Sequence, residues 1–549
     1  MSEASAAPKT AMQRVLDAVE RVGNMVPHPV LIFLALIAIV IVLSQILAMA
    51  GVSVTQEVFV PSDSPAQPGD EFDAAEYDTG VAVNYHAPDQ KSYKIEQRKI
   101  SARSLLNTEG IRFIYSSLIP SFMGFTAVGL MIAAMIGAGV AEESGLVKTL
   151  IRKLVIISPP WALTYILAFV GIVSSIAADA GYLVLIPLAG IAFMSVGRHP
   201  IAGLALAFAA VAGAFTVNML IKPLDAVLVE FTNDAIALVD PSKSIGLASN
   251  LWFSIASVIV LTLVIAFITE RLIEPRLGKY VPAKSDDEPA ADKSKNEGTN
   301  LSAAESRGLL YAGIGLVVVG ILFALLALPA GAPLRDAETG VLIGNSPFMN
   351  GLIAMIMVLF LVTGAAYGYG AGTLGSLTDI IKAMEKAMSG LGGLILLFFV
   401  LAQFVAYFNY TNMGTILALS LADTLKTANF PALVLLLAFI LVVALIDLLI
   451  TGAIAKWALF APVFVPLLME LGVLPDAVLA AYRIADSPIN SITPLNAYFA
   501  LVVGFCQRYD KNSGVGTVVS LMLPYVVLTF LAWTILFVIW HLAGLPWGV

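Results

Sequence analysis

Residues 447–462 read "DLLITGAIAKWALFAP" and place an acid, Asp447, and a base, Lys456, inside an apolar run. A charged side chain at the centre of a bilayer costs about 3 kcal/mol even on lenient insertion scales. The small residues "TGA" between the two charges favour a turn. Non-helical backbone is tolerated at membrane depth only where protein or water surrounds it. We therefore interpret this stretch as the tip of a re-entrant hairpin that faces a solvated site.

The composition is that of a membrane protein. Of 549 residues, 59% are hydrophobic and 12% are charged, with a mean hydropathy of +0.90, whereas soluble proteins carry about 25% charged residues. Apolar runs such as 30–51 and 251–267 reach the ~20 residues that a helix needs to span a bilayer. The first run lacks a small-residue cleavage site, so we interpret it as a retained span. We predict an all-α polytopic membrane protein.

Nine spans and two re-entrant hairpins account for the apolar runs. The tip "SSIAADAG" (174–181) resembles the opening stretch, and it predicts a hairpin over 159–195 to match one over 431–472. The nine spans are predicted at 26–50, 119–141, 200–235, 251–272, 307–329, 349–370, 391–410, 477–507 and 517–546.

Lys and Arg in the short loops indicate the orientation, because such loops stay in the cytoplasm. They place the N-terminus inside and the C-terminus outside. We predict a cytoplasmic N-terminus (1–25), a first membrane half (26–275) with an outer loop (51–112), a cytoplasmic linker (276–306) and a second membrane half (307–549). The linker's "KSDDEPAADKSKNEG" has the composition of a flexible segment.

The two halves share a weak internal repeat. In each hairpin an aromatic residue, Tyr182 or Trp457, stands five residues before a proline. Farther along, "VNMLIKPLD" (217–225) and "INSITPLN" (489–496) each combine Asn, Pro-Leu and then Asp or Asn. Proline removes a backbone hydrogen bond, so both motifs predict broken helices. Hairpins entering from opposite sides predict an inverted repeat, with a binding site near the membrane midplane.

Arg483 and Asp486 are three residues apart and so share a face of a helix. In the functional interpretation, Arg483 holds an anionic substrate group, and Asp486 orients it or carries a cation. The alternative is a neutralised structural pair, although buried ion pairs are poor stabilisers.

Carboxylates near the hairpin tips are candidates for coupling. Asp179 lies on the first tip, and Asp447 and Lys456 flank the second. A carboxylate beside unwound carbonyls suits Na⁺, which prefers oxygen ligands, and Asp179 and Asp447 would then hold the ion. The same carboxylate suits a proton carrier if burial raises its pKa. The alternative is an Asp447–Lys456 bridge that only pins the hairpin.

Asparagines and prolines mark the predicted breaks. Each asparagine either satisfies loose backbone groups or lines a site. These residues are Asn218, Asn490, Asn496, Pro223 and Pro494.

Trp457 and the glycine-rich tract can be explained by packing alone. Trp457 either stacks on an aromatic substrate group or packs against a neighbouring helix. The tract "GAAYGYGAGTLG" (364–375) is typical of close helix packing. The single Cys506 excludes an internal disulfide, and the four histidines show no metal-ligand spacing. No basic stripe indicates a nucleic-acid partner.

Several stretches resemble one family. The most specific are "AKWALFAPVFVP" (455–466) and "AYRIADSPINSITPLNAYFAL" (481–501), supported by "FVAYFN" (404–409) and "GVGTVVSLMLPY" (514–525). They look like the AbgT family of bacterial transporters, the p-aminobenzoyl-glutamate transporter family. The resemblance covers nearly the whole chain and is least clear over 51–110.

This resemblance implies a homodimer in the bacterial inner membrane, with a scaffold and a moving transport core in an elevator-like arrangement. It implies uptake of p-aminobenzoyl-glutamate or export of sulfonamides, driven by Na⁺ or H⁺, with no other cofactor. The partners would be an anionic or aryl small molecule and the lipid bilayer. The family's substrate and cation positions fall here on Asp179, Trp457, Pro475, Arg483, Asp486 and Pro494.

This chain also departs from the family pattern. Asp447 stands where the family favours Asn, hydroxyls are missing at Gly452 and Ile454, and Lys222 and Asn496 look unusual. These changes point to an altered coupling ion or substrate. A dicarboxylate carrier of related architecture is the first alternative. An intramembrane aspartyl enzyme is a second, although its "GxGD" motif is absent. A channel would not need hairpin tips that carry opposite charges.

Overall fold

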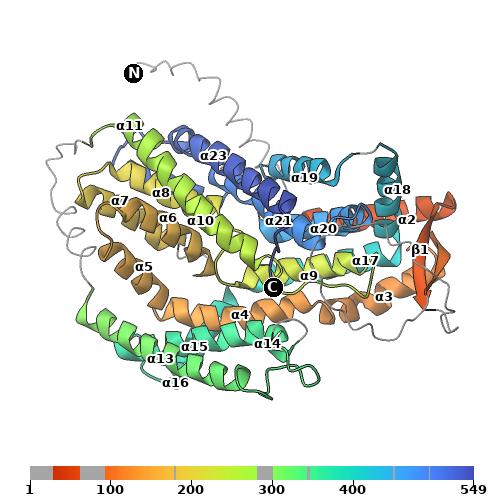
Figure 1. The fold of residues 1–549 in the computed structure, drawn as a ribbon, viewed down its shortest axis with the longest axis horizontal. Helices are drawn as coiled ribbons and strands as arrows, with labels where there is room; N and C mark the ends of the chain where they lie inside the picture. The colour runs from red at the N-terminus through yellow and green to blue at the C-terminus, as the bar shows by residue number, and fades with distance from the viewer. Residues whose placement is uncertain are drawn as a thin grey trace, which may run out of the picture.

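The computed structural model describes residues 29–61, 93–177, 181–280, 301–342, 346–428, 430–448, 452–493 and 495–549. The predicted N-terminal segment 1–25 lies outside these residues, as do most of the linker 276–306 and two candidate site residues, Asp179 and Pro494. Figure 1 shows a long, layered bundle of helices with a small sheet at one end.

Eight helical segments in the described part of the chain are long and apolar enough to cross a membrane, which confirms the predicted helical membrane class. Seven of them correspond to predicted spans, and the eighth is an arm of the second hairpin. The helices are α2 (Pro29–Met49), α3 (Thr108–Met123) with α4 (Thr126–Glu143), α10 (Leu251–Ile268) with η3 (Thr269–Ile273) and α11 (Glu274–Leu277), α13 (Ala303–Ala327), α15 (Leu352–Ala371), α17 (Gly392–Tyr410), α20 (Ala453–Glu470) and α23 (Val515–Leu542).

The helix predicted over 119–141 begins earlier, at Thr108. The side chain of Asn107 caps its start by accepting a 2.7 Å hydrogen bond from the backbone N–H of Gly110. The polar first turns hid this start from a hydropathy reading. The segment is interrupted between α3 and α4, near Gly124 and Phe125.

Two predicted spans are broken helices, as their Asn and Pro motifs predict. Span 200–235 consists of α8 (Pro200–Gly213) and α9 (Pro223–Ile236), and an irregular segment joins them. Span 477–507 consists of α21 (Pro475–Asp486), the short turn η4 (Pro488–Ser491) and α22 (Phe499–Gln507). Pro223 and Pro475 each stand in the first turn of a helix, where no N–H is needed.

Pairs of helices fill the two predicted hairpin regions. Within 159–195 lie α6 (Leu163–Val173), η1 (Ser174–Ala177), η2 (Gly181–Leu185) and α7 (Ile186–Ser195). Within 431–472 lie α19 (Ala432–Asp447) and α20. Gly452, directly before α20, has a φ of +105°, which L side chains rarely adopt.

Helix α8 packs against α6, α7, α10 and α23, toward the end of the bundle far from the sheet (Figure 1). Every residue of α8 is buried, as expected for a helix that is apolar on all sides and surrounded by protein.

Close packing of small residues joins α4 to α15. A Cβ on Gly137 would lie 2.3 Å from the carbonyl oxygen of Met357. A Cβ on Gly364 would lie 2.7 Å from the backbone of Ala141. The prediction that the tract 364–375 serves close packing is therefore confirmed at Gly364.

The remaining elements lie outside the predicted spans, except that α14 overlaps the start of the span predicted at 349–370. They are α5 (Leu146–Ile156), α14 (Pro347–Asn350), α16 (Leu377–Ser389), α18 (Met413–Ala428), and the strands β1 (Ser53–Pro61) and β2 (Tyr93–Ser101). The two strands pair antiparallel, with Ser53 opposite Ser101. No strand was predicted in the outer loop 51–112, because its mixed polar composition masked the pairing.

Candidate functional site

The two broken helices meet at their breaks. Thr216 lies in the irregular segment between α8 and α9, and Ser487 follows α21 directly. The backbone N–H of Thr216 donates a 3.1 Å hydrogen bond to Oγ of Ser487, and the two hydroxyls also contact each other. Oγ1 of Thr216 donates at 2.9 Å to the carbonyl oxygen of Arg483. Both side chains are fully buried, so the two halves of the chain share one polar centre.

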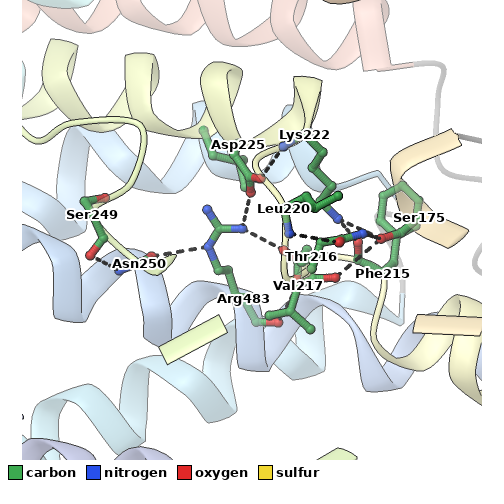
Figure 2. Close-up of polar contacts among 12 residues, drawn as sticks. Ser175, Phe215, Thr216, Val217, Leu220, Lys222, Asp225, Ser249, Asn250 and Arg483 are labelled. Carbon is green, nitrogen blue, oxygen red and sulfur yellow. Dashed lines mark hydrogen bonds and ion pairs between the residues drawn. The ribbon is translucent and has the colours of Figure 1, made fainter. Parts of the chain in front are cut away.

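Arg483 binds the start of α9 rather than Asp486. Its Nη1 donates to Oδ1 of Asp225 and to the carbonyl oxygen of Thr216, both at 2.6 Å (Figure 2). Its Nε donates to Oδ1 of Asn250 at 3.2 Å. The side chain is 3% exposed, and no described residue accepts a hydrogen bond from Nη2. A spacing of three residues leaves about 60° between side chains around the helix axis, so Arg483 and Asp486 meet different neighbours.

Lys222 is a second buried cation at the same break, 1% exposed. Its Nζ donates to the carbonyl oxygen of Phe215 and, at 3.3 Å, to Oγ of Ser175 on the first hairpin (Figure 2). The ammonium lies 5.1 Å from the centroid of the Phe215 ring. Among the described residues, no carboxylate lies within ion-pair distance of it.

Asn218 and Pro223 complete the first break. Nδ2 of Asn218 donates to the carbonyl oxygen of Val173 at 2.8 Å and to Oγ of Ser175 at 3.1 Å. Asn218 thus ties the break to the end of α6 and satisfies loose backbone groups there. Asp225 accepts a 2.9 Å hydrogen bond from the backbone N–H of Lys222, which caps α9.

A second ionic cluster contains Asp486, the last residue of α21. Nζ of Lys456 lies 2.6 Å from Oδ1 of Asp486 and also pairs with Asp447. All three side chains are 0% exposed. The Asp447–Lys456 bridge considered from the sequence is therefore present, and Asp486 extends it. The hydroxyl of Tyr482 donates to the carbonyl oxygen of Ala453 and lies 3.2 Å from Oδ1 of Asp486.

The two clusters carry opposite excess charge. The Arg483 cluster consists of Lys222, Arg483 and Asp225, with two cations and one carboxylate. The Lys456 cluster consists of Asp447, Asp486 and Lys456, with two carboxylates and one ammonium. The first arrangement favours a bound anion. The second favours a proton or a hard cation with oxygen ligands.

Asn490 and Asn496 support the second break. Nδ2 of Asn490 donates to the carbonyl oxygen of Asp486 at 2.8 Å and lies 3.4 Å from its Oδ2. Nδ2 of Asn496 donates at 2.9 Å to the carbonyl oxygen of Asn490. Asn490 therefore borders the Lys456 cluster, while Asn496 holds the turn behind it.

Trp457 packs between helices in this conformation. Its ring is fully buried and lies 4.5 Å from the ring of Tyr482. Its Nε1 donates to the carbonyl oxygen of Leu228 at 3.0 Å and to Oγ1 of Thr232 at 3.1 Å. Contact with an aryl group would require α20 to separate from α9.

Sequence reasoning did not single out several residues of the site. Tyr482 stands one turn before Asp486, which is a usable helical signal. The pairing of Asp225 with Arg483 crosses between the two halves, and no local pattern indicates it. The same is true of the contacts of Thr216, Ser175 and Asn250.

A cavity of about 620 Å³ lies next to the Arg483 cluster and is lined in part by Ser249, Asp476, Trp540 and Trp547. Asn250 links the two, because its Nδ2 donates to the carbonyl oxygen of Asp476 at 2.9 Å while its Oδ1 accepts from Arg483.

A model of the AbgT putative transporter family matches residues 14–549. This chain belongs to the AbgT family. The AbgT assignment agrees with the paired broken helices and with the resemblance of the "AKW" and "YRIAD" stretches.

Relatives of this AbgT protein include transporters of known structure. The p-aminobenzoyl-glutamate transport protein of Escherichia coli (strain K12) is 32% identical over 548 residues, which is 100% of this chain and 98% of the relative. The YdaH transporter of Alcanivorax borkumensis, whose crystal structure has an unusual topology, is 38% identical with a TM-score of 0.82, over 95% of this chain and 100% of that one.

A third relative is MtrF of Neisseria gonorrhoeae, described as illuminating a class of antimetabolite efflux pumps. It is 37% identical with a TM-score of 0.83, over 96% of this chain and 97% of that one. The architecture predicted for this AbgT protein therefore matches solved members of its family.

Proposed function

We propose that this AbgT-family protein is a secondary active transporter in the bacterial inner membrane, with a cytoplasmic N-terminus. It moves p-aminobenzoyl-glutamate or a related aryl carboxylate, and a Na⁺ or H⁺ gradient drives it. The observation that carries the proposal is the pair of buried clusters with opposite excess charge that meet α21 at Arg483 and at Asp486, three residues apart. Such a pair suits a carrier that binds an anion and a cation together.

The substrate carboxylate binds at the Arg483 cluster. Nη2 of Arg483 has no acceptor among the described residues. Asn250 bonds Arg483 on one side and, on the other, Asp476, which lines the 620 Å³ cavity. Asn218 and Asn490 stand at the two breaks that border the site. Pro494, which the sequence places in the second broken motif, is a further candidate substrate-binding residue. Trp457 stacks on the aryl ring in the state in which α20 has moved away from α9.

The coupling cation binds at the Lys456 cluster. In the ion-free state the Lys456 ammonium pairs with both Asp447 and Asp486, which would otherwise repel each other more strongly. A Na⁺ ion or a proton on these carboxylates releases the lysine from them. Asp179, on the first hairpin, is the third candidate coupling carboxylate.

Transport requires the outward-facing and inward-facing states to bind the substrate and the ion with different affinities. A ligand shifts the equilibrium between two states only by the difference in its affinity for them. The hairpins and broken helices form the moving core, and the homodimer forms around the scaffold. Export of sulfonamides fits the same site, as the description of the MtrF relative as an efflux pump suggests.

A dicarboxylate carrier is the second candidate function. The observation that favours it is the presence of two cations, Lys222 and Arg483, around one carboxylate. The intramembrane enzyme is not favoured, because the Lys456 ammonium pairs with both Asp447 and Asp486.

Uptake of labelled p-aminobenzoyl-glutamate into proteoliposomes tests the proposal. A Na⁺ gradient and a pH gradient are imposed separately, and Asp447→Asn is measured beside the wild type. Saturable uptake under one gradient, with altered ion dependence in Asp447→Asn, is the expected result. Uptake that no gradient drives would overturn the coupling, and uptake of short dicarboxylates alone would favour the second candidate.

A further inference from the structure

Among the described residues, Lys222 forms no ion pair. An ammonium offers three N–H donors, and the described residues supply two acceptors, the carbonyl oxygen of Phe215 and Oγ of Ser175. Both acceptors are neutral. Burying a charge without a partner of opposite charge is costly, and such charges are normally paired. The hydrogen bond from Lys222 to the carbonyl oxygen of Phe215 therefore does not by itself explain a buried charge at this position.

Backbone capping at this break does not need a charge. Asn218 satisfies the carbonyl oxygen of Val173, and Thr216 satisfies that of Arg483, with neutral side chains. A neutral donor at position 222 would serve Phe215 in the same way. The positive charge is thus an addition to the structural role.

Asp225 makes no direct contact with the Lys222 ammonium. Its Oδ1 accepts from Arg483, and its Oδ2 accepts from the backbone N–H of Lys222, not from the ammonium. The ammonium extends instead toward Ser175 on the first hairpin. Figure 2 shows Arg483 and Ser175 on opposite sides of the segment that contains Thr216.

The two cations are held on consecutive carbonyl groups. Nζ of Lys222 contacts the carbonyl of Phe215, and Nη1 of Arg483 contacts that of Thr216. Consecutive Cα atoms are about 3.8 Å apart, so the break holds two positive groups on neighbouring peptide units of one segment. Each has at least one N–H without an acceptor among the described residues. Two such donors match two carboxylates carried by one small molecule.

We propose that Lys222 is a second cationic contact for the substrate and makes this site select aryl substrates with two carboxylates over those with one. This inference rests on the proposed function and names the substrate class of that same site. A ligand with one carboxylate leaves a buried ammonium unpaired, whereas a ligand with two neutralises it. A hydrogen bond to a charged group accounts for a preference of about 10- to 100-fold.

A matched pair of ligands tests the inference without any mutation. p-Aminobenzoyl-glutamate carries two carboxylates, and p-aminobenzoyl-glutamine has the same shape with one of them replaced by an amide. Binding of each to the purified full-length protein is measured by titration calorimetry. The wild type is expected to bind the glutamate compound about 10- to 100-fold more tightly.

Variants then assign the preference to Lys222. Lys222→Met is expected to bring the ratio of the two affinities to within about threefold of unity, and Lys222→Arg is expected to retain the preference. Lys386→Met is the matched control, because it also removes one positive charge, from an exposed side chain on α16 that pairs with Glu143. The control is expected to leave the ratio unchanged.

The outcomes separate the two proposals. Equal affinity of the wild type for both ligands would overturn the inference, as would a Lys222→Met variant that loses affinity for both by the same factor. If the wild type binds neither ligand, the proposed aryl-carboxylate function fails first and the inference falls with it.

Discussion

The hydroxyl of Thr216 donates a 2.9 Å hydrogen bond to the backbone carbonyl of Arg483. Through this contact, the break of the first half supports the residue that carries the guanidinium of the second. The guanidinium in turn donates to the carbonyl oxygen of Thr216 and to Asp225. Thr216 and Arg483 thus each donate a hydrogen bond to the backbone carbonyl of the other. A change at either break should therefore alter the geometry of both.

The Arg483–Asp225 pair should behave as one energetic unit. Breaking a buried ion pair by removing one partner costs about 3–5 kcal/mol, because the other charge stays buried. We expect Arg483→Gln and Asp225→Asn each to lower the apparent Tm of the purified protein strongly. The double variant should lose less than the sum of the two. Strictly additive losses in thermal unfolding would show that the pair is not coupled.

Lys456→Met should make the protein's stability depend on Na⁺. Without the ammonium, Asp447 and Asp486 remain buried together and require another cation. We expect the Tm of this variant to rise with added NaCl and not with N-methylglucamine chloride at the same ionic strength. The wild type, which carries its own ammonium, should show a smaller difference between the two salts. A variant that responds equally to both salts would argue against a cation site here.

Trp457→Phe should lower stability more than substrate affinity. The change keeps an aromatic ring and removes the N–H that donates to Leu228 and Thr232, at a cost of about 1 kcal/mol. Trp533→Phe is the matched control, since its buried Nε1 donates to Oγ of Ser257 at 2.8 Å. We expect similar losses of Tm and a KM for uptake within about threefold of wild type in both. A much larger rise in KM for Trp457→Phe would indicate that the indole N–H itself contacts the substrate.

Gly137→Ala should loosen the packing of α4 on α15. Its added Cβ would lie 2.3 Å from the carbonyl oxygen of Met357, whereas a Cβ on Gly129, in the same helix, meets nothing within 4 Å. Overpacking typically costs about 1–3 kcal/mol. Thermal unfolding should therefore show a clear loss for Gly137→Ala and little change for Gly129→Ala. Equal effects of the two substitutions would mean that the contact is not close.

The helical membrane class and both broken helices could be predicted from the sequence, because apolar length and Asn-Pro motifs are local signals. The bridge between Asp447 and Lys456 could be considered for the same reason, since both residues belong to one hairpin. The pairing of Arg483 with Asp225 could not, because it joins positions 258 residues apart.

Arg483 and Asp486 lie three residues apart on one helix, as predicted, but the alternative of a neutralised pair between them is not what the structure shows. Each side chain meets a stronger partner on another element, Asp225 on α9 and Lys456 on α20. The pair of strands β1 and β2 was also missed, because pairing depends on a partner strand and not on either sequence alone.

The contacts between the two breaks also constrain the order of biosynthesis. When the ribosome has completed α8 and Thr216, the groups that satisfy this segment, Arg483 and Ser487, are still untranslated by about 270 residues. Unpaired carbonyls cannot remain in contact with lipid. The first half must therefore keep this segment in water or against the insertion machinery until the second half arrives. Truncated chains that end before α21 should accordingly be substrates for membrane quality control and not stable half-transporters.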